Sequence, residues 1–444
     1  MASRLQARVR DRRGIGMGGL LVIGGLLGAV ATGCEDSHDG TTGDTRWTGH
    51  LADTYQMGKA DNAEAVRVLP GGQGAVLLSS KARKATLFRI ANGRLAWARE
   101  KAFYPADPTE SEMTNLDVSS DGTWAVATRT ILEVNGDGQQ VRCGGMAVFF
   151  DITDSESFGT ILAEVEVGPM PDAVAISDDD RLVAVANERD GPEAWGKCEV
   201  PGAIPSISIL SLPAGPTSAQ EQVRIPMRDG GTGPREPESI VFAKDHDLVV
   251  ATLQDSHEVA LFRVSEVAAK AAPSSDDLRI VPLPANALGA LPWPDGVARC
   301  VGPDGSEFFV VAGEWNDTFS ILDGAGTIRS TTEISPRDIP ADLPRVIDEG
   351  SPLFSPDSVA CFVRGGRVHG AFTLRHAGAV AVYDLSDPGA PTFVQAIAVG
   401  REERGAADEN GSTVRPEGIS ATSDGGVVVV ANEQESSLSL ILPL

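Results

Sequence analysis

A unit of two short strands recurs along the chain, and this repeat limits the folds that are open to it. Residues 171–188 contain a strand that begins with Pro-Asp, a turn of three aspartates, and a second strand that ends in Asn-Glu. The same plan returns at residues 416–433, close to the C-terminus. Self-similarity of this kind is typical of repeat architectures, in which each unit packs against its neighbours. The fold is therefore best inferred from the repeat.

The repeat occurs seven times in the 444 residues. Each unit has a first strand, an Asp- and Gly-rich turn, a second strand and a third strand, and a further strand-like run lies between units, as at residues 161–167 and 222–226. From Glu64 to Glu417 the spacing averages about 59 residues over six steps. Short apolar runs bounded by turns favour an all-β protein. Seven units of four antiparallel strands predict a seven-bladed β-propeller.

The seventh unit reaches the C-terminus after its third strand. Without a fourth strand its edge would be left unpaired, which proteins normally avoid. Residues 46–57 are the remaining segment that could supply that strand. We therefore expect this N-terminal segment to close the ring, so that the propeller spans residues 46–444.

The first 33 residues have the plan of an export signal. Five arginines precede an apolar, glycine-rich segment at residues 14–30, and the sequence Ala-Thr-Gly then leads to Cys34. This ending resembles the lipobox of bacterial lipoproteins, so residues 1–33 are expected to be a signal peptide of lipoprotein type and Cys34 the lipid-modified residue. An ordinary signal peptide or an uncleaved anchor fits the same plan. The polar residues 34–45 are expected to form a flexible tether. The chain would then be exported and anchored to a membrane, facing the periplasm or the cell surface.

The chain carries a net charge of −25. Nucleic-acid-binding proteins need basic surfaces, so nucleic acid is excluded as a partner. A strongly acidic surface is consistent with a soluble monomer or with the attraction of cations. The sequence does not identify an envelope protein or a small molecule as the ligand.

Four cysteines follow Cys34, and an even number in an exported chain suggests disulfides. Cys143 and Cys198 are expected in loops between the second and third strands of blades two and three, on one face, where they could pair. Cys300 and Cys361 fall on the first strands of blades five and six. These two could pair or could remain small buried apolar residues.

The residue at the start of each first strand should lie at one mouth of the central channel, because first strands line the axis of a propeller. Six of the seven are acidic, and the position reads Glu64, Thr114, Asp172, Glu238, Asp295, Asp357 and Glu417. The polar residues that end the second strands are expected beside them: Asn187, Glu188, Glu314, Asn432 and Glu433.

Carboxylates that crowd together raise one another's pKa unless a cation is present. Oxygen ligands of this kind suit Ca²⁺ or Mg²⁺ rather than zinc, so we predict a divalent-cation site among these residues, with Ca²⁺ as the possible cofactor. The alternative is structural, since an acid after proline can accept hydrogen bonds from backbone N–H groups at the start of a strand. Blades three and seven share the full Asn-Glu ending and are the first places to search.

Residues for acid–base catalysis are sparse. His257 and His376 are expected in loops on the acidic face, near Arg129, Arg189 and Arg375, where a histidine could act as a general base. Solvated loop histidines are the simpler interpretation. The sequence contains no Gly-x-Ser-x-Gly motif and no glycine-rich phosphate loop.

Several repeats resemble those of the choice-of-anchor I surface proteins, which are related to mesenchyme-specific cell surface glycoproteins. The matching stretches are residues 171–188, 236–254, 380–388 and 416–433. The Asp-Gly turns and the Ala-Asn-Glu strand ends are also similar to those of lactonase-like and YVTN propellers. The resemblance implies a propeller that is exported and anchored at the cell envelope, and it does not specify a reaction.

Two functions are compatible with these observations. The first is a lipid-anchored binding or scaffold protein without enzymatic activity, which acts through the acidic mouth. The second is a divalent-metal-dependent hydrolase, acting on a lactone or a phosphoester at the same mouth. A propeller can serve either purpose, so the fold does not choose between them.

Overall fold

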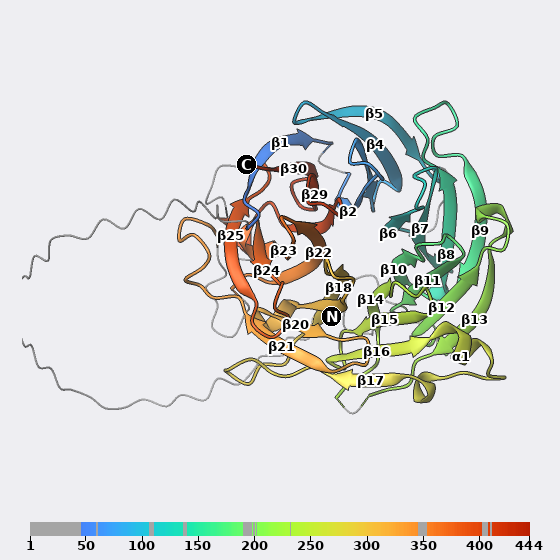
Figure 1. Ribbon diagram of the computed structural model, residues 1–444. Coiled ribbons are helices and arrows are strands. Elements are labelled where there is room, and N and C mark those ends of the chain that lie inside the picture. The colour runs from blue at the N-terminus through green and yellow to red at the C-terminus, as the bar shows by residue number, and fades with distance from the viewer. Residues whose placement is uncertain are drawn as a thin grey trace, which may run out of the picture. The chain divides into compact units, whose positions relative to one another are not determined.

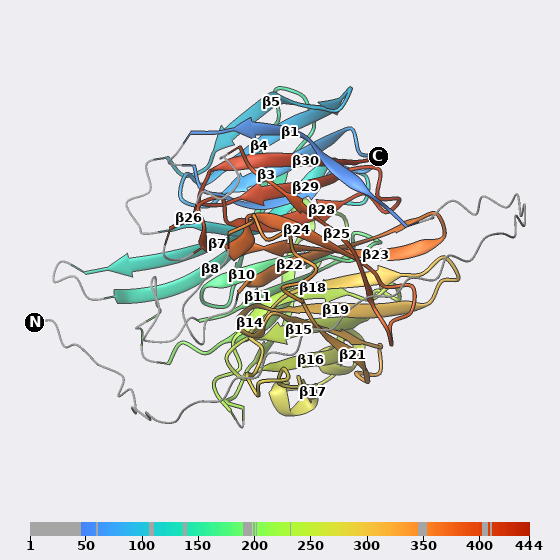
Figure 2. The same ribbon diagram turned by 90° about the vertical axis from the view of Figure 1, so that its left-hand side faces the viewer.

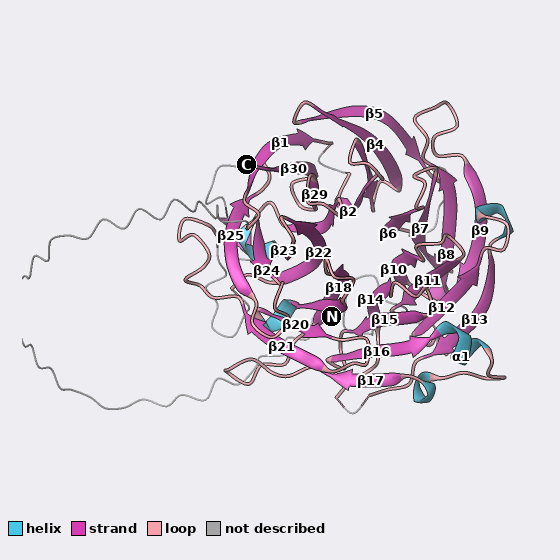
Figure 3. Cartoon of the chain, in the orientation of Figure 1, coloured by secondary structure: helices cyan, strands magenta, loops and turns pink. Residues whose placement is uncertain are grey.

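The computed structural model describes residues 46–444, apart from 59–60, 106–110, 136–139, 190–197, 199, 201, 231, 345–352, 402–406 and 409–410. The predicted signal peptide, the tether and Cys34 lie outside the described residues. Within the described part, seven four-stranded antiparallel sheets form a ring (Figure 1). Strands dominate, and the few helical turns are short and lie in connections (Figure 3). The prediction of an all-β, seven-bladed propeller is confirmed.

Each of the first six blades is one continuous stretch of chain. Blade 1 contains β2 (Ala63–Val68), β3 (Gly74–Ser79), β4 (Lys84–Ala91) and β5 (Arg94–Ala102), and blade 2 contains β6 (Met113–Val118), β7 (Trp124–Val134), β8 (Gln140–Asp151) and β9 (Ile161–Val167). Blade 3 contains β10 (Pro171–Ile176), β11 (Leu182–Asn187), β12 (Ser206–Ser211) and β13 (Gln220–Pro226), and blade 4 contains β14 (Pro237–Phe242), β15 (Leu248–Leu253), β16 (Glu258–Arg263) and β17 (Arg279–Pro282). Blade 5 contains β18 (Pro294–Val301), β19 (Glu307–Gly313), β20 (Thr318–Leu322) and β21 (Ile328–Glu333), and blade 6 contains β22 (Pro356–Arg364), β23 (Arg367–Leu374), β24 (Ala379–Asp384) and β25 (Thr392–Ala398).

The connections hold small additional elements. They are α1 (Val264–Ala268), the 3₁₀ turns η1 (Pro216–Ser218), η2 (Ser275–Asp277), η3 (Glu314–Asn316) and η4 (Arg375–Ala377), and the two-residue strands β26 (Ala407–Asp408) and β27 (Gly411–Ser412). No helix among the described residues is long and apolar enough to cross a membrane.

Blade 7 joins the two ends of the propeller. It contains β28 (Pro416–Ala421), β29 (Val428–Asn432) and β30 (Ser437–Pro443), and its outer strand is β1 (Gly49–Gln56). β1 pairs antiparallel with β30, from Gly49 opposite Pro443 to Gln56 opposite Ser437. The two strands, at opposite ends of the colour scale, lie side by side in Figures 1 and 2. The predicted closure of the ring by the N-terminal segment is confirmed.

Apolar clusters fill every interface between neighbouring blades. The β6–β9 and β10–β13 sheets, for example, share a cluster in which Trp124 and Phe149 pack with Val174 and Val185. Comparable clusters join the other pairs, including blades 7 and 1, where Val429 and Leu440 pack with Val66 and Leu77. Full burial of one large aliphatic or aromatic side chain stabilises the folded protein by about 1.5–3 kcal/mol. The core is therefore a closed circle of interfaces, and each blade depends on two neighbours.

Two disulfides link neighbouring blades. Cys300 on β18 pairs with Cys361 on β22, with Cα atoms 5.2 Å apart. Cys143 pairs with Cys198, with Cα atoms 5.6 Å apart. Cys143 lies within β8, and the expectation that it lies in a loop is wrong, because the β7–β8 hairpin continues beyond the edge of the blade. Disulfides persist in oxidising compartments, so the pairing indicates an extracytoplasmic environment.

The closing strand should contribute strongly to stability. Deleting residues 46–57 exposes the edge of β30 and removes Trp47, which is 3% exposed, packs against Phe362 and donates a hydrogen bond from Nε1 to Gly425 O at 3.0 Å. Loss of a buried aromatic alone costs about 3–5 kcal/mol, so Tm measured by calorimetry should fall by at least ~4 °C.

A deletion of the predicted tether, residues 34–45, is the matched control for this experiment. It removes twelve residues as well, and we expect it to change Tm by less than about 2 °C, since polar terminal segments add little to stability. Equal Tm values for the two deletion variants would contradict the role of β1.

Candidate functional site: the acidic mouth of the channel

An extra residue in each first strand turns the predicted acid position toward the axis. In blade 3, Pro171 pairs with Asn187 and Ala173 pairs with Ala186, so Asp172 forms a β-bulge. The same one-residue shift occurs near the start of the first strand in all seven blades. Bulges re-aim side chains and recur beside functional sites. All seven residues at the acid position line one central cavity of about 550 Å³.

Glycines allow the inner strands to approach each other at two of these bulges. A Cβ atom on Gly296 would lie 2.7 Å from the carbonyl oxygen of Asp357, and one on Gly418 would lie 2.6 Å from that of Glu64. No real Cβ atom tolerates such contacts with backbone. The residue after the acid therefore has to be glycine in blades 5 and 7, where the next blade presents its own acid.

The ends of the second strands alternate from blade to blade. The second strands of blades 3, 5 and 7 end in asparagine or glycine, and a glutamate follows, namely Glu188, Glu314 and Glu433. Blades 2, 4 and 6 lack this glutamate and instead carry a threonine two residues before the equivalent position, namely Thr128, Thr252 and Thr373. Thr252 Oγ1, for instance, accepts a hydrogen bond from Ser239 N at 2.8 Å and donates one to Asp295 O at 2.8 Å. Each of these threonines thus donates a hydrogen bond to the backbone carbonyl oxygen of the acid in the following odd-numbered blade.

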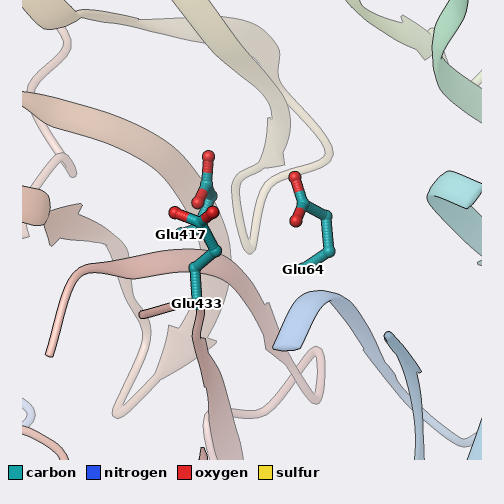
Figure 4. Close-up of side chains that lie close together, drawn as sticks. All are labelled: Glu64, Glu417 and Glu433. Carbon is teal, nitrogen blue, oxygen red and sulfur yellow. The ribbon is translucent and has the colours of Figure 1, made fainter. Parts of the chain in front are cut away.

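This alternation sorts nine carboxylates into three groups, each with ligand atoms within 4.8 Å of one another. Each group combines the first-strand acid and the glutamate of an odd blade with the first-strand acid of the next blade. We call them the blade 3–4 trio (Asp172, Glu188 and Glu238), the blade 5–6 trio (Asp295, Glu314 and Asp357) and the blade 7–1 trio (Glu64, Glu417 and Glu433). Figure 4 shows the last of these, with Glu417 and Glu433 side by side and the Glu64 carboxylate turned toward them. Blade 2 carries Thr114 at the acid position and contributes to none.

Arg375 lies between two of the trios. Its Nη1 atom is 3.0 Å from Glu314 Oε1 and 3.3 Å from Asp357 Oδ2, and its Nη2 atom is 3.5 Å from Glu417 Oε1 and 3.7 Å from Glu433 Oε2. A guanidinium group has five donors in a planar fork and can bind several carboxylates at once. These carboxylates, with Glu417 first, hold the pKa of Arg375 well above its ordinary value.

Two polar side chains add hydrogen bonds at the mouth. Asn62 Nδ2 donates to Glu64 Oε2 at 3.1 Å and lies 3.3 Å from Glu433 Oε1, and Ser355 Oγ donates to Glu314 Oε1 at 3.2 Å. Both residues precede their first strands and have positive φ angles of 55° and 53°. Asn62 thus donates to the blade 7–1 trio and Ser355 to the blade 5–6 trio, and Arg375 contacts both of these trios.

Burial shifts most of the carboxylate pKa values upward. Burial, followed by the charges of Glu433 and Asp172, raises the pKa of Glu64 to about 8. Burial also raises the pKa of Asp357 to about 7, against the opposing effect of Arg375. The pKa values of Glu238, Asp295 and Glu417 are raised well above the usual range, first by burial and then by their charged neighbours. These groups favour either a bound proton or a bound cation.

Glu433 is the exception. Burial would raise its pKa, but the hydrogen bond with Glu417 and the charge of Arg375 outweigh that effect and lower it. The pKa values of Glu417 and Glu433 are therefore shifted in opposite directions.

The structure corrects the placement of two predicted ligands. The amide groups of Asn187 and Asn432 point into their blades, where Asn187 Nδ2 donates to Ser206 O at 3.0 Å and Asn432 Nδ2 donates to Ser437 Oγ at 2.9 Å. Both residues are fully buried. Successive side chains of a strand point to opposite sides, so an asparagine that faces the blade leaves the following glutamate to face the mouth.

The histidines and other arginines considered from the sequence have separate surroundings. His257 Nδ1 lies 2.6 Å from Pro292 O, and His376 is in η4, where its backbone N–H donates to Phe354 O at 3.0 Å. Arg129 lies over the ring of Tyr104, 3.7 Å from its centre, and Arg189 has a positive φ of 56°. None of these four belongs to a described carboxylate trio.

Sequence reasoning missed the role of Arg375 as a counter-ion and the hydrogen bonds of Asn62. Arg375 occupies the repeat position of Glu188, Glu314 and Glu433, so alignment of the units could have placed it among the acids. Asn62 precedes the first strand of blade 1, and no repeated pattern marks it.

The fold and site together define a seven-bladed β-propeller with an acidic channel mouth. No protein-family model and no curated protein matches the sequence. Among solved structures, the chain is similar to a streptogramin B lyase, with a TM-score of 0.51, 14% identity, and coverage of 88% of this chain and 97% of that one.

It is also similar to a catalytically inactive variant of virginiamycin B lyase from Staphylococcus aureus solved with quinupristin, with a TM-score of 0.52, 13% identity, and coverage of 88% and 99%. At these identities the likeness concerns the fold alone. It places the chain among the propellers and leaves its ligand open.

The raised carboxylate pKa values predict a pH dependence of the metal-free protein. In the unfolded chain Glu and Asp have pKa values of about 4.3 and 3.9, whereas Glu64 and Asp357 titrate at about 8 and about 7 in the folded protein. The folded state therefore binds more protons between these limits, and stability falls as pH rises. With a chelator present, Tm should decline from pH 5 to pH 8.5.

Asp357→Asn separates this effect from the general charge of the protein. The variant cannot ionise at this position, so its Tm should decline less steeply above pH 6 than that of the wild type. Asp424→Asn, in an exposed turn where the pKa is lowered, is the matched control and should keep the wild-type slope. A wild-type Tm that is flat or rises over this range would contradict the argument.

Proposed function

We propose that this protein is a lipid-anchored, extracytoplasmic binding propeller that takes up a divalent cation at its acidic channel mouth. The observation that carries the proposal is the sorting of nine carboxylates into three trios with ligand atoms within 4.8 Å of one another. Three hard oxygen ligands at this spacing suit Ca²⁺, which accepts carboxylates in flexible geometry. Water would complete its coordination from the cavity.

The cellular location is supported by two independent features. The disulfides Cys143–Cys198 and Cys300–Cys361 favour an oxidising compartment. The arginine-rich start, the apolar segment and the small residues before Cys34 favour export and lipidation. In this proposal the lipid holds the protein at the membrane, and the propeller acts as a monomer toward the periplasm or the surface.

The resemblance to choice-of-anchor I surface proteins agrees with such a role. The stretches that carry it include the first-strand acids of blades 3, 4 and 7 and two of the three glutamates that follow second strands, Glu188 and Glu433. A bound cation would offset the repulsion among these acids and order the loops at the mouth. A partner in the envelope would then meet a rigid, ion-loaded face.

Ca²⁺ should stabilise the folded protein, because a ligand that binds the folded state alone raises its stability. At 100 times the Kd the gain is about 2.7 kcal/mol, which for a domain of this size is a rise in Tm of roughly 3 °C. The measurement is calorimetry of chelator-treated protein with and without Ca²⁺ at pH 7.5.

The double substitution Glu417→Gln with Asp172→Asn should abolish the rise in Tm. Its matched control is Glu266→Gln with Asp276→Asn, which also removes two carboxylates, from exposed positions outside the mouth, and should keep the rise. No response of the wild type to Ca²⁺ or Mg²⁺ would overturn the proposed cation binding.

A metal-dependent hydrolase is the second candidate, and one observation favours it. The carboxylates of Asp357 and Glu64 lie in different trios, and a carboxylate beside a bound ion can act as a general base. They line a cavity of about 550 Å³, which can hold a small ligand. When bound, the ion would polarise a carbonyl or phosphoryl oxygen, and these residues would hold or accept the proton of the attacking water.

Hydrolysis of a simple lactone and of p-nitrophenyl phosphate by the Ca²⁺- or Mg²⁺-loaded protein tests this second candidate. Activity should fall by at least about 100-fold in Asp357→Asn if its carboxylate is the base. Rates equal to the uncatalysed reaction for both substrates would leave the binding function as the only proposal.

A further inference from the structure

A second cavity lies on the outside of the ring, between blades 7 and 1. It has a volume of about 300 Å³ and opens between the end of β1 and the outer strands β4 and β5 (Figure 1). This volume is at the lower end of the range for ligand pockets, ~300–1,000 Å³. Its described lining residues include no member of the three carboxylate trios, so the cavity is separate from the acidic mouth. We call it the blade 7–1 outer cavity.

A β-bulge in β5 turns an indole ring and a carboxylate toward this cavity. Phe88 of β4 pairs with Trp97, and Thr86, two residues earlier, pairs with Glu100, so β5 has one extra residue. Side chains three residues apart in a regular strand point to opposite faces, whereas the extra residue places those of Trp97 and Glu100 on one face. Both side chains line the cavity, and Trp97 is 51% exposed. A large apolar ring is thus available to a ligand.

Charges of both signs line the same cavity. Lys84 Nζ is 2.9 Å from Asp61 Oδ2 and 3.5 Å from Glu100 Oε2. Lys84 and Asp61 are half-buried, and Glu100 is exposed. An ammonium group and a carboxylate can each form more hydrogen bonds than these ion pairs use. The ion pairs therefore hold the three groups in place and leave donors and acceptors for a ligand.

Thr86 adds a hydroxyl group to the cavity. This residue lines the cavity and is 2% exposed, and its Oγ1 atom forms no hydrogen bond with any described residue. A hydroxyl group can both donate and accept hydrogen bonds, and leaving it unpaired in the interior is unfavourable. A polar ligand in the cavity would provide the missing partner. This observation is independent of the charged groups.

The charges select the kind of ligand. A cationic ligand would be repelled by Lys84, and an anionic ligand would be repelled by Asp61 and Glu100. A neutral ligand with many hydroxyl groups avoids both repulsions, and it can accept from the ammonium group and donate to the carboxylates. The indole of Trp97 adds a second requirement, because the negative face of its π-system attracts the C–H groups of a flat apolar surface. A sugar in the pyranose form has such a surface and carries hydroxyl groups around its edge.

We propose that the blade 7–1 outer cavity binds a neutral sugar, with one pyranose ring stacked on Trp97. Lys84 donates a hydrogen bond to one sugar hydroxyl, and Asp61 and Glu100 accept hydrogen bonds from others. Thr86 pairs with the group of the sugar that enters deepest. The proposal does not depend on cation binding at the acidic mouth, and it gives the protein a second ligand of a different chemical class.

Isothermal titration of the full-length protein with three neutral trisaccharides tests the proposal: maltotriose, cellotriose and N,N′,N″-triacetylchitotriose. A chelator is present throughout, so that the result is independent of metal ions. At least one trisaccharide should bind, and Trp97→Ala should weaken that binding by at least about 10-fold, because a stacked Trp contributes strongly to affinity.

Trp315→Ala is the matched control for this experiment. Trp315 is also exposed, at 44%, and it packs against Trp293 outside the cavity. Its removal should change the sugar affinity by less than about twofold, since surface positions away from an interface contribute little to binding.

Thr86→Val separates a role in ligand binding from a role in stability. Valine has nearly the same shape as threonine and lacks the hydroxyl group, so the sugar affinity should fall by at least about threefold. The Tm of the sugar-free protein should not fall, because the substitution removes a hydroxyl group that has no partner among the described residues. A Tm that falls together with the affinity would overturn the role of Thr86 in the site.

Three results would overturn the proposal as a whole. A wild type that binds none of the three trisaccharides has no such sugar site. Equal affinities of the wild type and Trp97→Ala, at equal Tm, would place the sugar elsewhere on the protein. Binding of Nα-acetyl-lysine amide in place of the sugars would show that the cavity accepts a cation. The outcome of the Ca²⁺ experiments at the mouth does not affect any of these results.

Discussion

The antiparallel pairing of β1 with β30 is the contact on which the rest of the propeller depends. Each blade is a four-stranded sheet that buries both faces against neighbours, so an open array would leave two apolar faces and an unpaired edge exposed. Closure joins segments nearly 400 residues apart and completes the blade 7–1 interface. Since that interface also carries Glu64, Glu417 and Glu433, the same closure assembles part of the mouth.

The closed ring compels like charges to approach each other. First strands converge on the axis, bulges turn their acids inward, and Gly296 and Gly418 let adjacent backbones come close. The resulting repulsion opposes folding, and the seven apolar interfaces offset it. A locally unfavourable arrangement that the surrounding structure holds in place is typical of functional sites. Arg375 reduces this cost at the blade 5–6 and blade 7–1 trios, and Asn62 reduces it at the blade 7–1 trio.

Similarity in fold does not imply the same chemistry at the channel mouth. The lyases that resemble this chain share its ring of blades at 13–14% identity. Propellers present loops and inner-strand ends at one mouth, and different side chains there serve different purposes. In this chain the distinctive feature is the two-blade alternation of threonine with glutamate, which seven blades cannot complete. Blade 1, with Leu78 at the threonine position and Ser80 at the glutamate position, is where the alternation is broken.

The repeat in the sequence was sufficient to predict the number of blades, the four-strand plan, the N-terminal closing strand and the common mouth for the acids. These follow from local periodicity and from the need to pair every strand edge. The grouping into trios, the inward turn of Asn187 and Asn432, and the position of Cys143 within β8 were decided by the tertiary structure. The trios depend on the one-residue bulges and on which blades are neighbours, and the position of Cys143 depends on the length of the β7–β8 hairpin. None of these leaves a periodic signal. The contacts of Arg375 with carboxylates of two trios were also decided by the tertiary structure. The contacts of a long side chain depend on which blades the closed ring places beside it.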